Sequence, residues 1–181
     1  MIETTFIKDL VIFTPRVFED ERGHFFESYN EKSFLENGIT TKFVQDNQSF
    51  STYGTLRGMH LQRGDHAQAK LVRVTKGEVL DVAVDLRPDS ATFGKYLSVK
   101  LSEENHKQIF IPRGFAHGFV VLSKEAIFQY KVDNYYNKES EAGFIFNDPS
   151  IAIDWLIPES DISLSEKDQI LPSFNGLKER L

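Results

Sequence analysis

Short segments that alternate between apolar and polar residues dominate this sequence and restrict the possible fold more than any other feature. In the segment 78–87, the apolar residues from Leu80 to Leu86 share one face, and the acidic residues Asp81 and Asp85 share the other. This period of two predicts strands with one buried face. The same alternation occurs in the segments 96–102 and 126–132, and a strand over 24–30 would place Phe25, Glu27 and Tyr29 on one face. Apolar runs in the segments 70–74 and 118–122 predict more fully buried strands.

Gly, Pro, Asn and Asp separate these segments at short intervals, which is typical of a β-sandwich or β-barrel. We expect only a few short helices. Asn30 is placed to cap a helix over 31–37, with Gly38 just past its end. Near the C-terminus, Ser163 or Ser165 can open another, since each is followed three residues later by an acid. No repeat or linker interrupts the chain, so the prediction is one all-β domain over residues 1–181 with a few short helices.

Composition excludes several classes of function. The formal net charge is −6, which argues against non-specific nucleic-acid binding but allows converging Arg and Lys residues to hold a small anion. The chain has no cysteine, so disulfides and thiolate chemistry are excluded. No apolar run is long enough to span a membrane, and the first residues lack the apolar core of a signal peptide. A cytoplasmic location is the default expectation.

One segment, 55–74, concentrates side chains that can carry chemistry: Arg57, His60 and Lys70. In a regular strand Arg57 and His60 would face opposite sides. Both can serve one site only if the strand kinks at Gly58 or if Arg57 reaches around a sheet edge, and the residues alone leave both alternatives open.

Three further residues have both a structural and a catalytic interpretation. His117 lies in a tight connection between apolar strands, where a hydrogen-bonded core histidine is the commoner role. Tyr130 lies on the apolar face of its strand and fits a core tyrosine, although it could also exchange protons inside a barrel. Asp168 fits a helix start, although it could also orient a distant histidine. Taken alone, each fits the structural role better.

The sequence offers little for a metal or a nucleotide-binding loop. His60 is followed by Leu61 and Gln62, so the close pair of histidines typical of a cupin metal site is missing. His66 falls in an expected turn, and His117 alone cannot hold a metal ion. The glycine-rich nucleotide-binding motifs and the GxSxG motif of serine hydrolases do not occur. We predict no catalytic metal.

Ten segments in order resemble the dTDP-4-dehydrorhamnose 3,5-epimerases. They include DERGHFFESYN, FVQDN, TLRGMHLQ, QAKLVRV, IPRGFAHGF, YKVDNYY and LSEKD, and the resemblance covers nearly the whole chain. It implies a cupin (jelly-roll) β-barrel, a homodimer, and activity without metal or nucleotide cofactor. The implied reaction converts dTDP-4-dehydro-6-deoxy-D-glucose to dTDP-4-dehydro-L-rhamnose, in dTDP-L-rhamnose biosynthesis.

The resemblance also implies roles for individual residues. His60 matches the catalytic base and Asp168 its partner. Tyr130 matches the proton donor on the opposite face of the sugar ring, and Lys70 the cation that stabilises the enolate. Positions that match substrate-contacting residues are Arg22, Glu27, Gln45, Asp46, Asn47, Arg57, Lys70, His117, Glu141 and Lys167.

These groups suit the implied chemistry. Protons on C3 and C5 are acidic because both carbons adjoin the 4-keto group, and epimerisation needs a base, a donor across the ring and a cation at the developing oxyanion. Three alternatives remain: an epimerase acting at C3 or C5 only, a metal-dependent cupin enzyme, and a cupin that binds a sugar without catalysis. Retention of both His60 and Tyr130 favours an epimerase over a ketoisomerase.

Overall fold

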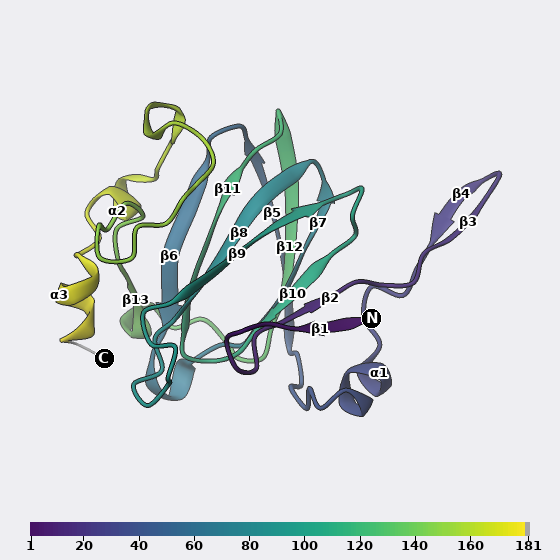
Figure 1. Cartoon of the computed structure of the whole chain (residues 1–181), viewed down its shortest axis with the longest axis horizontal. Helices are drawn as coiled ribbons and strands as arrows, with labels where there is room; N and C mark the ends of the chain where they lie inside the picture. Colours follow the sequence, from purple (N-terminus) through teal and green to yellow (C-terminus); the bar gives the residue numbers. More distant parts are fainter. Residues whose placement is uncertain (180–181) are drawn as a thin grey trace.

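Two antiparallel sheets face each other and form a jelly-roll barrel (Figure 1). The structure, a computed structural model, describes residues 1–179, so the last two residues of the predicted domain lie outside it. The six-stranded sheet has the order β1 (Ile2–Thr4), β2 (Val11–Phe13), β10 (Gln108–Ile111), β7 (Lys70–Lys76), β12 (Glu125–Val132) and β5 (Gln45–Thr52). The five-stranded sheet has the order β13 (Glu141–Gly143), β6 (Leu56–Gln62), β11 (Phe115–Val121), β8 (Glu78–Asp85) and β9 (Tyr96–Ser102). The predicted all-β fold is confirmed.

The helices are few and short, as expected. In α1 (Glu31–Glu36) the Asn30 side chain accepts a hydrogen bond from the Ser33 backbone N–H, which confirms the predicted cap. Ser165, rather than Ser163, caps α2 (Glu166–Gln169). The remaining helical elements are α3 (Phe174–Lys178), which was not predicted individually, and the 3-10 turns η1 (Gly64–His66), η2 (Lys138–Ser140) and η3 (Glu159–Asp161). Within residues 1–179, no helix is long and apolar enough to cross a membrane.

The prediction that β8 has one buried face was wrong, because both of its faces are buried. Its leucine and valine face packs outside the barrel, against the C-terminal segment. The face that carries Asp81 and Asp85 points into the barrel together with Val79 and Ala83, and neither carboxylate is exposed. Alternation in the sequence is therefore correct, but it does not mark a solvent face here.

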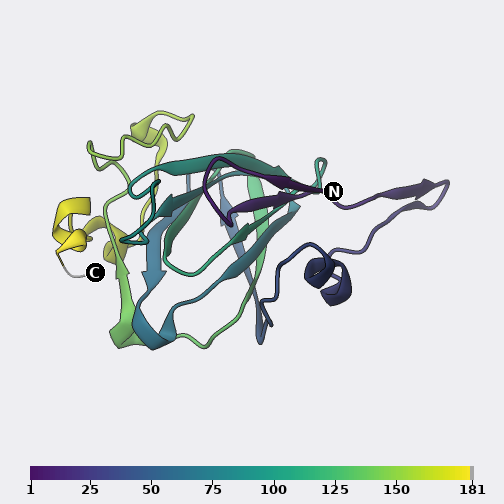
Figure 2. The same ribbon diagram turned by 60° about the horizontal axis from the view of Figure 1, so that its bottom comes forward.

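A C-terminal cover lies over the outside of the five-stranded sheet. Phe144, Trp155 and Phe174 pack there against the outward face of β6 and β8. In Figures 1 and 2 this part of the chain, including α2 and α3, lies beside β6. Burial of several aromatic side chains fixes the cover on the sheet, at about 1.5–3 kcal/mol for each fully buried side chain. The cover thereby brings α2 to the barrel.

A β-hairpin made of β3 (Phe18–Asp20) and β4 (Gly23–Phe25) extends away from the barrel (Figures 1 and 2). A strand was expected over 24–30, but β4 ends at Phe25. Phe18 and Phe25 are 51% and 67% exposed. Large aromatic side chains exposed on a projecting element are typical of a surface that contacts another molecule.

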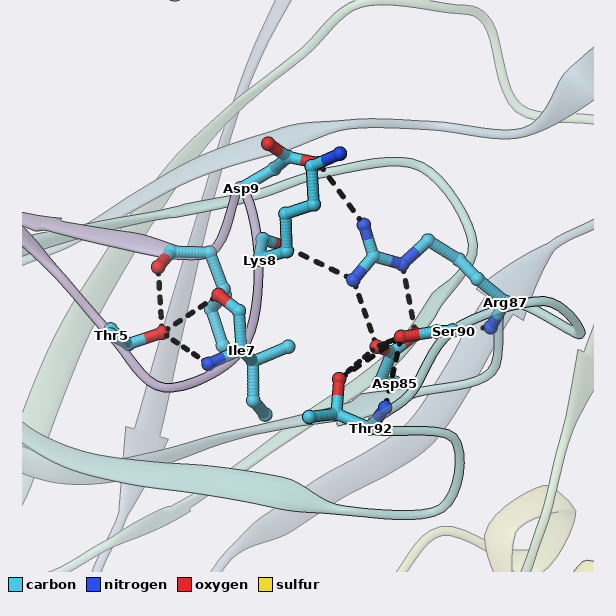
Figure 3. A network of polar contacts seen from close by, with 9 residues as sticks. Thr5, Ile7, Lys8, Asp9, Asp85, Arg87, Ser90 and Thr92 are labelled. Carbon is cyan, nitrogen blue, oxygen red and sulfur yellow. Dashed lines mark hydrogen bonds and ion pairs between the residues drawn. The ribbon is translucent and has the colours of Figure 1, made fainter.

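A polar network anchors the loop between β1 and β2 to the loop after β8 (Figure 3). The Asp85 carboxylate accepts hydrogen bonds from Arg87, Ser90 and Thr92. Arg87 in turn donates to the Lys8 carbonyl and pairs with Asp9. Burial alone would raise the pKa of Asp85, but these hydrogen bonds lower it to about 2. The carboxylate is therefore ionised throughout the physiological range.

Candidate active site

His60 and Asp168 lie 108 residues apart and are joined by a hydrogen bond of 2.6 Å between Nε2 and Oδ1. The carboxylate is almost buried, at 4% exposure. Burial alone would raise the pKa of Asp168, but hydrogen bonds from His60, Ser165 and the Gly58 backbone lower it. An ionised carboxylate at Nε2 favours a proton on that nitrogen, so Nδ1 becomes the nitrogen that can accept a proton.

Asp168 reaches His60 along the edge of the five-stranded sheet. β13 pairs with β6 as far as Gly143 opposite His60, and the next residue, Phe144, exchanges two backbone hydrogen bonds with Met59. Beyond that point the segment that begins at Ser163 runs along the same edge, and the Leu56 N–H donates to the Ser163 carbonyl at 2.9 Å. The first turn of α2 follows, and the Gly58 N–H donates to the Asp168 carboxylate. The edge of β6 thus holds both His60 and Asp168, which are called the dyad below.

The kink at Gly58 that would bring Arg57 and His60 to one face is present. His117 of β11 is opposite His60, and Phe119 is opposite Arg57, so three steps along β6 match two steps along β11. An extra residue of this kind is a β-bulge, and it returns Arg57 to the face of His60. Gly58 has φ +138°, and a Cβ there would lie 2.5 Å from the Cα of Gly118. Glycine is therefore required at this position.

A second pair of a histidine and a carboxylate lies next to the dyad inside the barrel. His117 Nε2 is 2.8 Å from Asp81 Oδ2, and both side chains are buried. Burial lowers the pKa of His117, and the Asp81 charge opposes the effect. Asp81 Oδ1 is buried and has no hydrogen-bond partner among residues 1–179. The sequence analysis placed Asp81 on the polar face of its strand and did not select it; the available signal was an acid with apolar neighbours on either side in the middle of the strand.

Lys70 and Tyr130 complete the group of ionisable side chains in the barrel. Lys70 Nζ lies 6.0 Å from the centre of the Tyr130 ring. Burial lowers the pKa of Lys70 to about 8, against the opposing charges of Asp81 and Glu141. Burial also raises the pKa of Tyr130, although the nearby charge of Arg57 opposes this. The tyrosine therefore keeps its proton at neutral pH.

The predicted substrate-contacting residues of β5 divide between its two faces. Asn47 is opposite the inward-facing Tyr130, and its side chain accepts a hydrogen bond of 2.8 Å from Gln45. Both residues therefore lie on the barrel side. Asp46 lies on the other face, where it pairs with Lys131 at 2.7 Å, so a single chain does not bring it to His60. Arg57 donates to Ser51 of β5 at 3.2 Å, on the barrel side.

Glu141 and Lys167 form an ion pair beside the dyad. Tyr136, which the sequence analysis did not select, donates a hydrogen bond of 2.8 Å to the same carboxylate. Burial alone would raise the pKa of Glu141, but the hydrogen bonds from Lys167 and Tyr136 lower it. Glu141 is close enough to His60 and Lys70 for its charge to act on both.

Arg22 and Glu27 are not brought to this group within one chain. The Arg22 side chain is 90% exposed at the turn of the projecting hairpin, where it pairs with Asp20 at 2.6 Å. Glu27 accepts a hydrogen bond from Asn30, at the base of that hairpin. The views in Figures 1 and 2 both place the hairpin away from the barrel.

The donor set around His60 does not resemble a metal site. In the part of the chain that the structure describes, no three His, Asp or Glu side chains are grouped so that they could hold a metal ion. What the barrel offers instead is a histidine with a carboxylate behind it, a cation and a hydroxyl. These are the groups with which an isomerase moves protons beside a carbonyl. The fold and the site together indicate a cupin-type isomerase that acts beside a carbonyl group.

Comparison with known proteins gives the particular family. The model of the dTDP-4-dehydrorhamnose 3,5-epimerase family matches residues 4–176. The chain is 54% identical to dTDP-4-dehydrorhamnose 3,5-epimerase of Escherichia coli K12 over 175 residues, which are 96% of this chain and 94% of that protein. It therefore belongs to the dTDP-4-dehydrorhamnose 3,5-epimerase family, and the resemblance noted in the sequence is confirmed.

Solved structures agree with this assignment. The epimerase of the same name from Elizabethkingia anophelis NUHP1 is 59% identical, with a TM-score of 0.94 over 97% of both chains. The dTDP-6-deoxy-D-glucose-3,5-epimerase of Legionella pneumophila Philadelphia 1 was solved in complex with dTDP-4-keto-L-rhamnose. It is 49% identical, with a TM-score of 0.92 over 97% of this chain and 93% of that one.

Proposed function

We propose that this protein epimerises C3 and C5 of dTDP-4-dehydro-6-deoxy-D-glucose and so forms dTDP-4-dehydro-L-rhamnose. The observation that carries this proposal is the 2.6 Å bond between His60 and Asp168, inside a barrel that also holds Lys70. Membership of the epimerase family supports the choice of reaction. The product bound in the Legionella pneumophila relative, dTDP-4-keto-L-rhamnose, supports the choice of sugar.

In this proposal His60 is the base that removes the protons from C3 and C5. Asp168 holds the imidazole in the required tautomer and stabilises the imidazolium after proton transfer. Lys70 faces the oxygen of the 4-keto group, where negative charge develops in the enolate. The buried setting that lowers the pKa of this lysine also strengthens its attraction to an oxyanion.

Tyr130 is proposed to return a proton to C5 from the opposite face of the ring. Its hydroxyl keeps its proton at neutral pH because burial raises its pKa. A positioned acid of this kind contributes on the order of 10² to 10⁴ in rate. The remaining proposed contacts to the substrate come from Arg22, Glu27, Gln45, Asp46, Asn47, Arg57, His117, Glu141 and Lys167.

A homodimer explains why Arg22 and Glu27 lie away from the barrel of their own chain. We propose that the projecting hairpin places them at the barrel of a second copy, where Arg22 joins Arg57 against the diphosphate. The exposed Phe18 and Phe25 of the hairpin support a contact of this kind. The cytoplasmic location stays a prediction from the sequence, which cell fractionation would test.

Incubation with dTDP-4-dehydro-6-deoxy-D-glucose in deuterated water, followed by NMR, tests the proposal directly. The expected result is deuterium at both C3 and C5, an L-rhamno product, and no turnover by His60→Ala. Deuterium at one carbon only would instead assign a single-site epimerase. If a folded protein exchanges neither position, the proposed reaction is wrong.

A further inference from the structure

Two neighbouring residues of α2 are held by two neighbouring strands. Asp168 is bonded to His60 of β6, and Lys167 is paired with Glu141 of β13. β13 and β6 are themselves hydrogen-bonded, with Glu141 opposite Gln62. The helix is therefore attached at two points to one rigid sheet edge.

The second attachment matters because α2 has only four residues. A single turn of helix is not stable by itself, so its position depends on what it is docked against. The Ser165 cap closes the turn but does not connect it to the sheet. Among the side-chain hydrogen bonds and ion pairs of α2 within residues 1–179, only those of Asp168 and Lys167 reach the strands that carry the site.

The ion pair of Glu141 with Lys167 is better placed than an ordinary surface pair. The Glu141 side chain is 17% exposed, while that of Lys167 is 55% exposed. Tyr136 donates to the second carboxylate oxygen at 2.8 Å, so the acid is fixed from two sides. Charge-assisted bonds to a largely buried acid are stronger than exposed pairs, which contribute little.

We propose that Glu141, fixed by Tyr136, is a positioning residue that clamps α2 through Lys167 and so keeps Asp168 on His60. This inference rests on the proposed role of His60 as the catalytic base. A shift of α2 by a fraction of an ångström would lengthen the Asp168 bond, because Lys167 and Asp168 are adjacent in one helical turn. Glu141 and Lys167 then serve catalysis even where they do not touch the substrate.

The test follows the His60 Nε2 proton in the free enzyme, so it does not depend on turnover. A hydrogen bond of this kind gives a downfield imidazole N–H signal that exchanges slowly with water, and His60→Asn identifies it. In both Glu141→Gln and Lys167→Met we expect this proton to exchange at least tenfold faster, or its signal to disappear. We expect kcat to fall on the order of 10-fold to 100-fold in both, since small misplacements of catalytic groups have effects of this size.

The two substitutions change the local charge in opposite directions, which separates a clamp from a direct electrostatic effect. Glu141→Gln removes a negative charge and Lys167→Met removes a positive one. A clamp predicts that both weaken the His60 bond, with Tyr136→Phe giving a smaller change in the same direction. Opposite changes in the two variants, or exchange as in the unaltered protein in both, would overturn the proposal.

Lys76→Met is the matched control, because Lys76 forms a similar half-exposed pair with Glu125 away from the dyad. It should leave the imidazole signal and kcat unchanged. Melting curves of all variants show whether the barrel is intact, and Tyr136→Phe carries the test if Glu141→Gln unfolds. If the unaltered protein does not epimerise the substrate but the variants lose the imidazole signal, the proposed function is wrong and the clamp stands. If the unaltered protein is active but the variants keep the imidazole signal, the proposed function stands and the clamp is wrong.

Discussion

Burial brings the pKa of Lys70 unusually close to neutral for a lysine. Burial lowers its pKa to about 8, while Asp81 and Glu141 hold the value up. The proposed mechanism needs the protonated lysine at the enolate oxygen. The charges of Asp81 and Glu141 therefore oppose the effect of burial and favour the protonated lysine that the proposed mechanism needs.

The activity should accordingly fall on the alkaline side. We expect kcat/KM, which reports the free enzyme, to decline above pH about 8 as Lys70 loses its proton. Asp81→Asn removes a charge that raises the pKa of Lys70, so the decline should begin at lower pH. Rate profiles of both proteins check this, and an alkaline limb at the same pH in both would contradict it.

Asp85 illustrates a buried charge with a structural role. Its pKa is lowered to about 2, below the unfolded value of about 4. A lowered pKa means that its stabilising effect is complete above pH about 4 and is lost as pH falls through about 2. We expect Asp85→Asn to cost about 3 kcal/mol at pH 7, because Arg87 loses its buried counterion and one of the two oxygens that accept from Arg87, Ser90 and Thr92 is replaced by a donor. Thermal unfolding measures this.

The control for Asp85 is Asp9→Asn at the outer end of the same network. The Asp9 side chain is 55% exposed, so its pair with Arg87 should contribute less than about 1 kcal/mol. The stability difference between Asp85→Asn and the unaltered protein should also shrink between pH 4 and pH 2. Equal losses from the two substitutions would show that burial does not decide their effect.

At the scale of elements, the bulge in β6 determines which side chains meet. It returns Arg57 to the face of His60 by adding one residue at Gly58. A regular strand would turn one of the two side chains toward the C-terminal cover. Whether Arg57 and His60 face the same site therefore depends on Gly58, which has no functional side chain of its own.

Gly58→Ala should consequently be severe. The added Cβ would meet the backbone of Gly118 at 2.5 Å, at a φ of +138°. We expect a loss of about 3 kcal/mol or more in stability, or no folding at all. Gly64→Ala is a matched control with φ +56° and open space around its Cβ, and it should cost about 1–2 kcal/mol. Similar unfolding curves for the two variants would contradict the steric argument.

Local patterns predicted the strands well but not their surroundings. Alternation over 78–87 gives the correct facing of each residue in β8, because the period of two is a property of the strand itself. It cannot show that the C-terminal cover buries one face and the barrel the other. The Asn30 and Ser165 caps were predictable for the same local reason.

The site required information that spacing does not contain. His60 and Asp168 meet only because the cover continues along the edge of β6, and nothing in their 108-residue separation indicates this. The pair was expected from the family resemblance. Asp81 and Tyr136 escaped selection because an acid on a polar strand face, or a tyrosine in a loop, is usually solvated.

At the scale of the whole molecule, the projecting hairpin suggests that one copy does not hold a complete site. If Arg22 acts at the barrel of a partner, then Arg22→Ala and His60→Ala damage different halves of each site. Mixing the two weakly active proteins under exchanging conditions should form mixed dimers with one intact site each. With equal amounts we expect about a quarter of the original activity.

Two outcomes of the mixing experiment would contradict the shared site. Full activity of Arg22→Ala by itself would remove Arg22 from the site. Absence of recovery, after size-exclusion chromatography has shown subunit exchange, would place both residues in the site of a single chain.

The position of Asp168 also has a consequence for the order in which the barrel and the site form during synthesis. Every strand of the barrel precedes α2 along the chain, and the Asp168 carboxylate follows the end of the last strand, β13, by 25 residues. A nascent chain still attached to the ribosome can therefore shape its barrel while the histidine lacks its counterion. Competence for proton transfer would therefore arrive after the barrel, once α2 has been synthesised and has brought its carboxylate to β6.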